Sequence, residues 1–304
     1  MKELMGLGTA LITPFKADKS VDYEALTRLL DTQLTGFVDY IVVLGTTGEA
    51  ATMTAEEKRE VREFIVQYTK QHPLPNGQNI PLVLGVGGNN TAAVISALQA
   101  MRDELILDFT AILSVCPYYN KPNQEGLYQH FCAVAEASPI PVILYNVPGR
   151  TGVNLLPETV MRIYEAQPDK IAGIKEASGN IAQIKDLIAL ANSKLKIKNY
   201  ELPFLVISGD DGIACEIMEA GGAGLISVAS NAFPEDFWHI VHDKNRALQA
   251  KYEEMVRLLF AEGNPVGIKA VLAQKGIIQN YLRLPLVPAS EELKERIKRL
   301  EVRG

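Results

Sequence analysis

The feature that most constrains the fold is a set of eight short apolar runs separated by segments with helical patterns. Each run is almost continuously apolar, which is typical of strands that are buried on both faces of a parallel sheet. The runs are "GTALIT" (8–13), "YIVVLG" (40–45), "IPLVLGVG" (80–87), "FTAILSV" (109–115), "IPVILY" (140–145), "IAGIK" (171–175), "FLVISG" (204–209) and "GLISVA" (224–229). Eight strand–helix units predict an α/β fold, a (β/α)8 TIM barrel with right-handed crossovers.

A doubly wound open sheet is the alternative architecture. It usually has fewer strands and a phosphate-binding glycine fingerprint directly after the first one. The stretch "GTALITPF" contains no such fingerprint, and "GVGGNN" (85–90) does not match GxGxxG. The pattern therefore favours the barrel and disfavours a nicotinamide-dependent oxidoreductase, which nucleotide binding would test.

Helix signals divide the chain at about residue 230. "TAEE" (54–57) has the pattern of a capping box, and the two asparagines at 89–90 can cap a helix from about Thr91 to Met101. After residue 230 only helical patterns follow. We therefore predict a barrel over residues 1–230, with its active site at the C-terminal strand ends, and C-terminal helices over 231–304.

The helices of this extension have recognisable starts. Asn264 is the expected N-cap of one helix, with Pro265 at its first position, and Ser290 is the expected N-cap of the last.

Composition narrows the classes of partner. The chain of 304 residues has 30 basic and 36 acidic side chains, and its net charge of −6 argues against a nucleic-acid partner. The three cysteines are isolated, which favours free thiols in a reducing compartment. The sequence shows no metal-binding box and no 18-residue apolar run, so we expect a cytoplasmic protein without a metal and without membrane contact.

Candidate chemistry collects where the strands end. Barrel enzymes carry their active sites at the C-terminal ends of the strands. Polar and glycine-rich stretches lie at these ends, namely "GTTGE" (45–49), "CPYYNKP" (116–122), "YNVPGRTG" (145–152) and "SGDD" (208–211). This one-sided distribution indicates an enzyme.

Lys175 ends an apolar strand at this edge. A lysine at such a place commonly marks only where a strand meets water. At the mouth of a barrel, however, partial burial disfavours the ammonium form, and a free amine attacks a ketone to give an imine. We therefore interpret Lys175 as a nucleophile.

Tyr145 ends the preceding strand, and neighbouring strands lie about 5 Å apart, so its phenol can transfer protons near the imine. An aromatic plug in the barrel mouth is an equally good interpretation of Tyr145. "GTTGE" can cradle a carboxylate or form a plain turn. Arg150 can bind a carboxylate or form a surface ion pair, and the tyrosines of "CPYYNKP" can also lie at a subunit interface.

Taken together, five motifs resemble the dihydrodipicolinate synthase / N-acetylneuraminate lyase family of class I aldolase-like enzymes. They are "GTTGE", "PYYNKP", "YNVPGRTG", "GIKEASGN" and "SGDD". They occur in the family's order and spacing, and the resemblance covers essentially the whole chain, including the helical tail.

The resemblance implies a pyruvate Schiff base on Lys175 and no metal or organic cofactor, because the imine itself serves as electron sink. Tyr145 looks like the proton donor and acceptor, with Thr46 and Tyr119 as its relay partners. The resemblance further implies that this tyrosine crosses a dimer interface within a homotetramer.

Substrate contacts follow from the same resemblance. Thr47 and the backbone of Ile226 look like pyruvate contacts, and Gly209 lies where the family's backbone faces the site. Arg150 matches the arginine that holds the carboxylate of aspartate semialdehyde in the synthases. Sugar-acid lyases of the family usually carry GSTGE and lack this arginine, so a synthase is favoured over a lyase such as N-acetylneuraminate lyase.

Two positions depart from the pattern of lysine-inhibited synthases. Ala93 replaces a glutamate and Ala55 replaces a histidine, although Asn89 and Tyr118 fit the effector cleft. The resemblance therefore implies weak or absent inhibition by lysine. A non-catalytic relative is disfavoured because Lys175, Tyr145, Thr46 and Tyr119 are all present.

Overall fold

The computed structural model describes residues 1–101, 105–198 and 204–301. Its eight strands follow one another in sequence order in a closed barrel, which confirms the predicted TIM barrel. The strands are β1 (Gly6–Ala10), β2 (Tyr40–Val43), β3 (Leu82–Gly85), β4 (Ala111–Val115), β5 (Val142–Asn146), β6 (Ile171–Glu176), β7 (Leu205–Ser208) and β8 (Gly224–Ser227). The pairings of β1 with β2, and of each strand from β3 to β8 with the next, are parallel, as expected when helices connect the strands.

Helices follow the strands, and further helices extend the chain beyond β8, as predicted. The α-helices of the described residues are α1 (Tyr23–Thr35), α2 (Ala55–Gln71), α3 (Thr91–Ala100), α4 (Gln124–Ala137), α5 (Pro148–Thr151), α6 (Pro157–Ala166), α7 (Ile181–Lys198), α8 (Ala214–Glu219), α9 (Pro234–His242), α10 (Arg246–Phe260), α11 (Val266–Gln274) and α12 (Glu291–Glu301).

Each predicted strand is present, but most are shorter than the apolar run that predicted them. The run 80–87 forms only Leu82–Gly85. Pro81 has no N–H to donate to the ladder, and glycines follow at 87 and 88. The strand core is therefore set by burial, and its ends lie beside a proline that cannot donate to the ladder and glycines that weaken it.

The predicted helix starts are confirmed with one exception. Thr54 and Glu57 form the capping box of α2, and Asn90 caps α3 by accepting from the Ala93 amide. The Leu293 amide donates to Ser290 Oγ at 3.2 Å.

The exception is the start of α11. It was predicted one residue too early: Pro265 is the N-cap, and Val266 is the first helical residue. The side chain of Asn264 does not cap the helix and instead donates to Thr47 Oγ1 at 3.0 Å.

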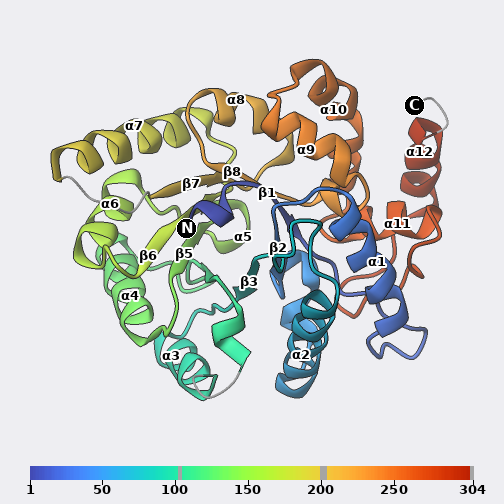
Figure 1. The fold of residues 1–304 in the computed structure, drawn as a ribbon, viewed down its shortest axis with the longest axis horizontal. Helices are drawn as coiled ribbons and strands as arrows, with labels where there is room; N and C mark the ends of the chain where they lie inside the picture. The colour runs from blue at the N-terminus through green and yellow to red at the C-terminus, as the bar shows by residue number, and fades with distance from the viewer. Residues whose placement is uncertain (102–104, 199–203, 302–304) are drawn as a thin grey trace. The chain divides into compact units, whose positions relative to one another are not determined.

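The chain forms two compact units, which we call unit 1 (Met1–Gly6 with Pro81–Ile226) and unit 2 (Leu7–Ile80 with Ser227–Gly304). In unit 1, α3, α4, α6, α7 and α8 contact one another in succession outside the strands (Figure 1). In unit 2, α9 contacts α10, and α10, α11 and α12 pack on one another. The boundary predicted at residue 230 stays a prediction.

Within unit 2, the segment that follows β8 is tied to β1. The Ile12 amide donates to Asn231 Oδ1 at 3.1 Å, and Asn231 Nδ2 donates to the carbonyl of Ala10 at 2.8 Å. Thr9 Oγ1 also lies 2.8 Å from Ser230 Oγ. All of these side chains are buried, so the start of the C-terminal segment forms part of the core of unit 2.

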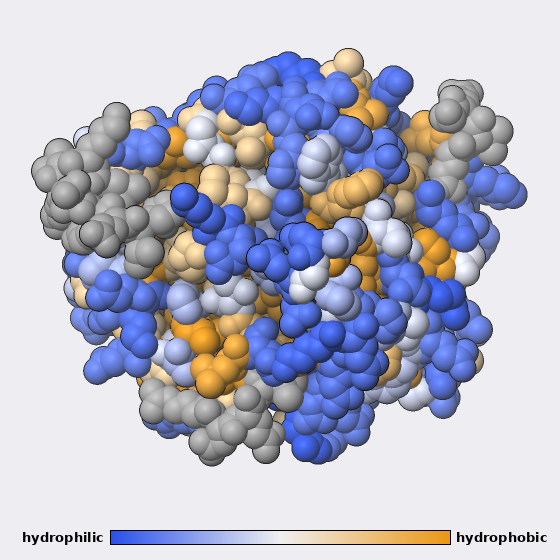
Figure 2. Space-filling model, in the orientation of Figure 1, coloured by the Kyte–Doolittle hydropathy of each residue, from blue (hydrophilic) through white to orange (hydrophobic). Residues whose placement is uncertain are grey.

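The outer face of α2 is polar. Figure 2 shows mainly hydrophilic residues over α2, which agrees with the exposed Glu56, Arg59 and Glu60 of that helix. Among the described residues, no helix combines the length and apolarity needed to cross a membrane.

Candidate active site

Lys175 is the fifth of the six residues of β6, and its side chain is buried although the residue is a lysine. Its neighbours in register are Tyr145 on β5 and Ile207 on β7. The Lys175 Nζ lies 4.5 Å from the centroid of the Tyr145 ring. The structure thus brings together the predicted nucleophile and the predicted proton-transfer residue.

Gly209 adjoins the same lysine. Its amide donates to the Glu176 carbonyl at 2.8 Å, which continues the ladder one residue beyond β7. A Cβ atom at position 209 would lie 2.8 Å from Lys175 Cε and 2.6 Å from Ala177 Cβ. The stem of Lys175 therefore occupies the space that any other residue at position 209 would need.

Successive residues of a strand point to opposite faces, so a second polar group lies on the other face from Lys175 and Tyr145. Glu176 is fully buried and accepts from Asn146 Nδ2 at 2.9 Å, Gln183 Nε2 at 3.2 Å and the Ser178 amide at 2.8 Å. Asn146 Oδ1 in turn accepts from the Leu155 amide at 3.0 Å. Neutral donors therefore hold this carboxylate and fix the ends of β5 and β6.

Sequence reasoning missed Glu176 and Asn146. The available signal was their position, because each directly follows one of the two predicted catalytic residues at a strand end.

Ile226 lies in β8 and is fully buried. Two register pairs place β8 beside β7: Ile207 with Gly224, and Ser208 with Leu225. Unit 1 thus carries Tyr145 on β5, Lys175 on β6, Gly209 directly after β7 and Ile226 on β8.

Arg150 belongs to α5, a four-residue helix that begins directly after β5 and ends at Gly152 in the left-handed conformation with φ 73°. The arginine is exposed. The Tyr119 amide donates to the Thr151 carbonyl at 3.3 Å, so the loop "CPYYNKP" is tied to the turn that carries Arg150.

Tyr119 is unusual in two respects. Its side chain is 88% exposed, and its φ of 75° is rare for a residue with a side chain of this size. An aromatic side chain held outward on a left-handed backbone is uncommon, so Tyr119 stands out among the candidate site residues.

Thr46 and Thr47 belong to unit 2, in a short 3-10 helix (Thr46–Gly48) after β2. Thr46 is exposed, whereas Thr47 is buried and its hydroxyl accepts from Asn264. Their predicted relation to Tyr145 in unit 1 remains a prediction.

Cys116 adjoins this arrangement through its backbone, because its amide donates to the Tyr145 carbonyl at 2.9 Å. All three cysteines are free, as predicted; Cys116 and Cys215 are buried, and Cys132 is half-buried. Burial and the nearby Glu176 raise the pKa of the Cys116 thiol, which disfavours the nucleophilic thiolate. In the described part of the chain, no three His, Cys, Asp or Glu residues gather where they could hold a metal ion.

Fold and site together define a TIM-barrel protein with a buried lysine at the end of its sixth strand, next to a tyrosine on the fifth. A family model, described as the dihydrodipicolinate synthetase family, matches residues 3–301. The chain belongs to this family.

Individual relatives agree along nearly the whole chain. The chain is 47% identical to a 4-hydroxy-tetrahydrodipicolinate synthase of Parabacteroides distasonis, over 99% of this chain and 98% of that protein. It also resembles the crystal structure of a dihydrodipicolinate synthase from Thermotoga maritima, with a TM-score of 0.88, 37% identity and 98% of each chain covered. A second similar structure is the chloride-inhibited dihydrodipicolinate synthase of Acinetobacter baumannii complexed with pyruvate, with a TM-score of 0.87, 37% identity and coverage of 98% and 97%.

Proposed function

We propose that the chain is a 4-hydroxy-tetrahydrodipicolinate synthase, which condenses pyruvate with L-aspartate-4-semialdehyde. Family membership and relatives that carry this name over nearly their full length support a pyruvate-dependent lyase. The observation that carries the mechanism is the buried amine of Lys175, placed 4.5 Å from the ring centroid of Tyr145.

The reaction begins when the Lys175 amine attacks the keto carbon of pyruvate. Water leaves and an imine forms, whose protonated nitrogen withdraws electrons from the methyl group. Loss of one methyl proton gives an enamine, and its carbon attacks the aldehyde carbon of the semialdehyde. The amine of the bound semialdehyde then displaces Lys175 from the imine carbon, which closes the ring and frees the lysine.

Tyr145 is the group that we assign to the proton transfers. Its place beside Lys175 in the strand register supports this role. Thr46 and Tyr119 are its proposed relay partners, as in the family. Thr47 and the backbone of Gly209 and Ile226 are the proposed contacts of pyruvate.

Borohydride trapping tests this chemistry. Reduction in the presence of pyruvate should add one pyruvyl group to the chain, and peptide mass mapping should place it on Lys175. The adduct should be absent in Lys175→Ala. An adduct on another lysine, or none in the wild type, overturns the proposal.

Arg150 decides the second substrate in this proposal. Its guanidinium can bind the carboxylate of the semialdehyde with two parallel hydrogen bonds, a geometry that lysine does not provide. Arg150→Lys should therefore raise the KM for the semialdehyde more than the KM for pyruvate. A coupled assay with N-acetylneuraminate is the complementary test, and efficient cleavage of that sugar acid would favour the lyase alternative.

The proposed assembly is a homotetramer, in which Tyr119 of each subunit reaches a neighbour. The 88% exposed side chain and the left-handed backbone of Tyr119 support this assignment. Sedimentation of the wild type and of Tyr119→Trp would test it, because a larger side chain at a contact should weaken assembly. The three free thiols support a reducing compartment, and we propose the cytoplasm.

Lysine inhibition is proposed to be weak or absent. Asn89 Nδ2 donates to the Tyr118 carbonyl at 3.2 Å, so these two candidate effector residues lie together in unit 1. Ala93 follows on α3 and offers only a methyl group where lysine-inhibited synthases of the family carry a glutamate. A lysine titration with strong, cooperative inhibition would reject this proposal.

A further inference from the structure

The turn that carries Thr46 and Thr47 ends at a buried acidic residue to which the proposed mechanism gives no role. Glu49 directly follows the short helix Thr46–Gly48, and its backbone is left-handed, with φ 52° and ψ 30°. Its side chain is only 3% exposed. A buried carboxylate in a backbone conformation that disfavours side chains requires partners that keep it there.

Lys269 of α11 is the ionic partner. Its Nζ forms an ion pair with Glu49 Oε1, and both side chains are almost completely buried. The same Nζ donates to the Tyr281 carbonyl at 3.1 Å and lies 4.2 Å from the centroid of the Phe15 ring. Burial lowers the pKa of Lys269 to about 8, and Glu49 opposes this shift.

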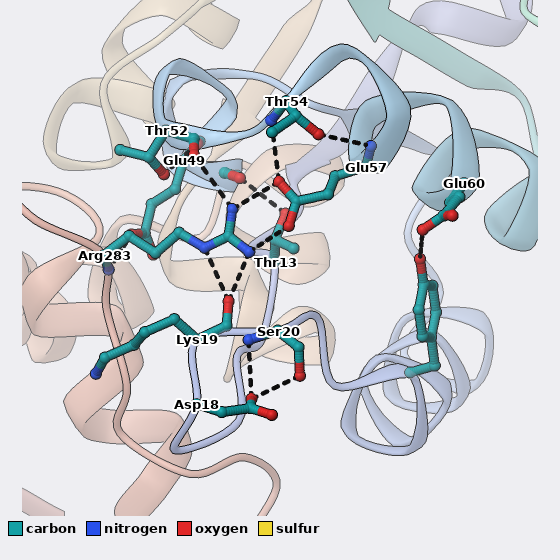
Figure 3. A network of polar contacts seen from close by, with 12 residues as sticks. Thr13, Asp18, Lys19, Ser20, Glu49, Thr52, Thr54, Glu57, Glu60 and Arg283 are labelled. Carbon is teal, nitrogen blue, oxygen red and sulfur yellow. Dashed lines mark hydrogen bonds and ion pairs between the residues drawn. The ribbon is translucent and has the colours of Figure 1, made fainter.

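Arg283 holds the other side of the same carboxylate. Its backbone amide donates to Glu49 Oε2 at 3.2 Å. Its guanidinium donates to Glu57 and to the carbonyls of Thr52 and Lys19 (Figure 3). Glu57 is also the capping-box residue of α2, so Arg283 ties the start of that helix to the segment that leads into it.

Each residue of the turn after Thr46 has its own anchor. The Thr47 hydroxyl accepts from Asn264, the Gly48 carbonyl accepts from Thr13 Oγ1 at 2.7 Å, and Glu49 is held by Lys269 and Arg283. Thr46 directly precedes these three anchored residues, and its side chain is exposed. Three of the anchoring residues, Asn264, Lys269 and Arg283, lie in the C-terminal helical region, more than 200 residues along the chain from the turn.

We propose that Glu49 is a positioning residue, whose ion pair with Lys269 holds the "GTTGE" turn so that Thr46 and Thr47 keep their working orientation. Glu49 does not touch the substrate; it acts through the backbone of the turn. This inference rests on the proposed function, which assigns the relay to Thr46. The C-terminal region would then support catalysis through Lys269, although none of its residues takes part in the reaction itself.

The test separates imine formation from proton transfer. Borohydride trapping with pyruvate measures how many molecules form the imine on Lys175. Exchange of the pyruvate methyl protons in D2O, followed by proton NMR, measures enamine formation and depends on the proton relay. Dividing the exchange rate by the trapped fraction removes any loss that comes only from unfolded protein.

Glu49→Gln keeps the size of the side chain and removes its charge. We expect trapping on Lys175 to remain and the exchange rate per trapped site to fall about tenfold or more, because small displacements of catalytic groups carry large rate penalties. An unchanged exchange rate per trapped site overturns the inference. If the wild type itself forms no pyruvyl adduct on Lys175, the proposed function is rejected instead.

Two further variants keep the test decisive. Glu57→Gln removes another carboxylate of the same network outside the turn, and its exchange rate per trapped site should stay within about twofold of wild type. Glu49→Gln combined with Lys269→Met removes the unpaired cation that the single variant leaves buried, and so recovers folding. Exchange should stay low in this double variant, and recovery to the wild-type rate would show that Glu49 has no positioning role.

Discussion

At position 209 any side chain would collide with Lys175, because a Cβ there would lie 2.8 Å from Lys175 Cε. We predict that Gly209→Ala lowers kcat by about 100-fold, since the lysine must leave its aligned position. Overpacking of this kind costs about 1–3 kcal/mol of stability, which is too little to unfold a chain of this size. Steady-state kinetics and thermal unfolding check both expectations.

Gly149→Ala is the matched control for this substitution. Apart from its chain neighbours and the backbone of its own helix, no atom lies within 4 Å of a Cβ built at Gly149, so this variant should keep its melting temperature and its kcat. Equal losses in both variants would contradict the assignment of a steric role to Gly209.

The buried carboxylate of Glu176 permits a second prediction about a single residue. Glu176→Ala removes a fully buried acceptor from Asn146, Gln183 and the Ser178 amide, and leaves Asn146 and Gln183 with their bonds to Asn154 Oδ1. We expect a loss of about 3 kcal/mol in the free energy of unfolding, measured by urea denaturation.

Glu165→Ala provides the comparison. It breaks a partly exposed ion pair with Lys194 and should cost less than about 1 kcal/mol. If the Glu165 variant were as destabilised as the Glu176 variant, the neutral network behind Lys175 would not have the stabilising role assigned to it.

Between helices, His130 links α4 to the start of α3. Its Nδ1 lies 2.9 Å from Thr91 Oγ1, and burial lowers its pKa from 6.5 to about 4. Between these two values the unfolded chain binds a proton that the folded chain does not, so stability must fall as the pH drops from 6.5 towards 4. His130→Gln should remove about 1–2 kcal/mol of the stability difference between about pH 7 and about pH 5.

His242 on α9 has the opposite effect on the pH dependence of stability. Its hydrogen bond to Asp39, at 2.7 Å, raises its pKa. The bond therefore stabilises the fold below the ordinary pKa of 6.5, and this contribution is lost as the pH rises through the raised value. As the pH falls, the urea midpoint of His130→Gln should rise relative to that of the wild type, and the midpoint of His242→Gln should fall relative to it. Shifts of both variants in the same direction would contradict the assignment.

The elements that sequence reasoning predicted are those set by local pattern. Continuous apolar runs predict β5 and β6, and the pair Thr54 and Glu57 indicates the start of α2. The start of α11 was misplaced because Asn264 fits an N-cap by residue type, although its side chain bonds to Thr47, 217 positions away.

In the candidate site, too, only the residues marked by local pattern could be predicted. Lys175 and Tyr145 follow from their strand-end positions, and their adjacency follows from strand order. The ion pair of Glu49 with Lys269 was not predictable, because nothing in the local pattern of either residue indicates the other. Glu176 was missed for a related reason: its burial depends on donors from α7 and β5.

At the scale of the whole molecule, the C-terminal segment is predicted to be indispensable to folding. We keep the division into a barrel over 1–230 and helices over 231–304 as a proposal about architecture, but not about independent folding. A chain ending at residue 230 would lose Asn231, which bonds to Ala10 and Ile12, and also Lys269, the ionic partner of Glu49. Isolating residues 231–304 would equally expose the apolar faces of α9–α12.

The truncated chain should therefore lack a cooperative thermal transition, as measured by circular dichroism. Adding the separately produced segment 231–304 at equal concentration is the control, because reassembly should restore part of the transition. A cooperative, native-like transition in residues 1–230 alone would contradict this prediction.

The burial of Cys116 and Cys215 has a practical consequence for the bench. A maleimide reagent needs an accessible thiolate, so these two positions should survive labelling untouched while the fold is intact. Replacing the half-buried Cys132 by serine would then give a variant without an accessible thiol, into which one new surface cysteine can be introduced. A fluorophore or a solid support could be attached at that single point without disturbing the barrel.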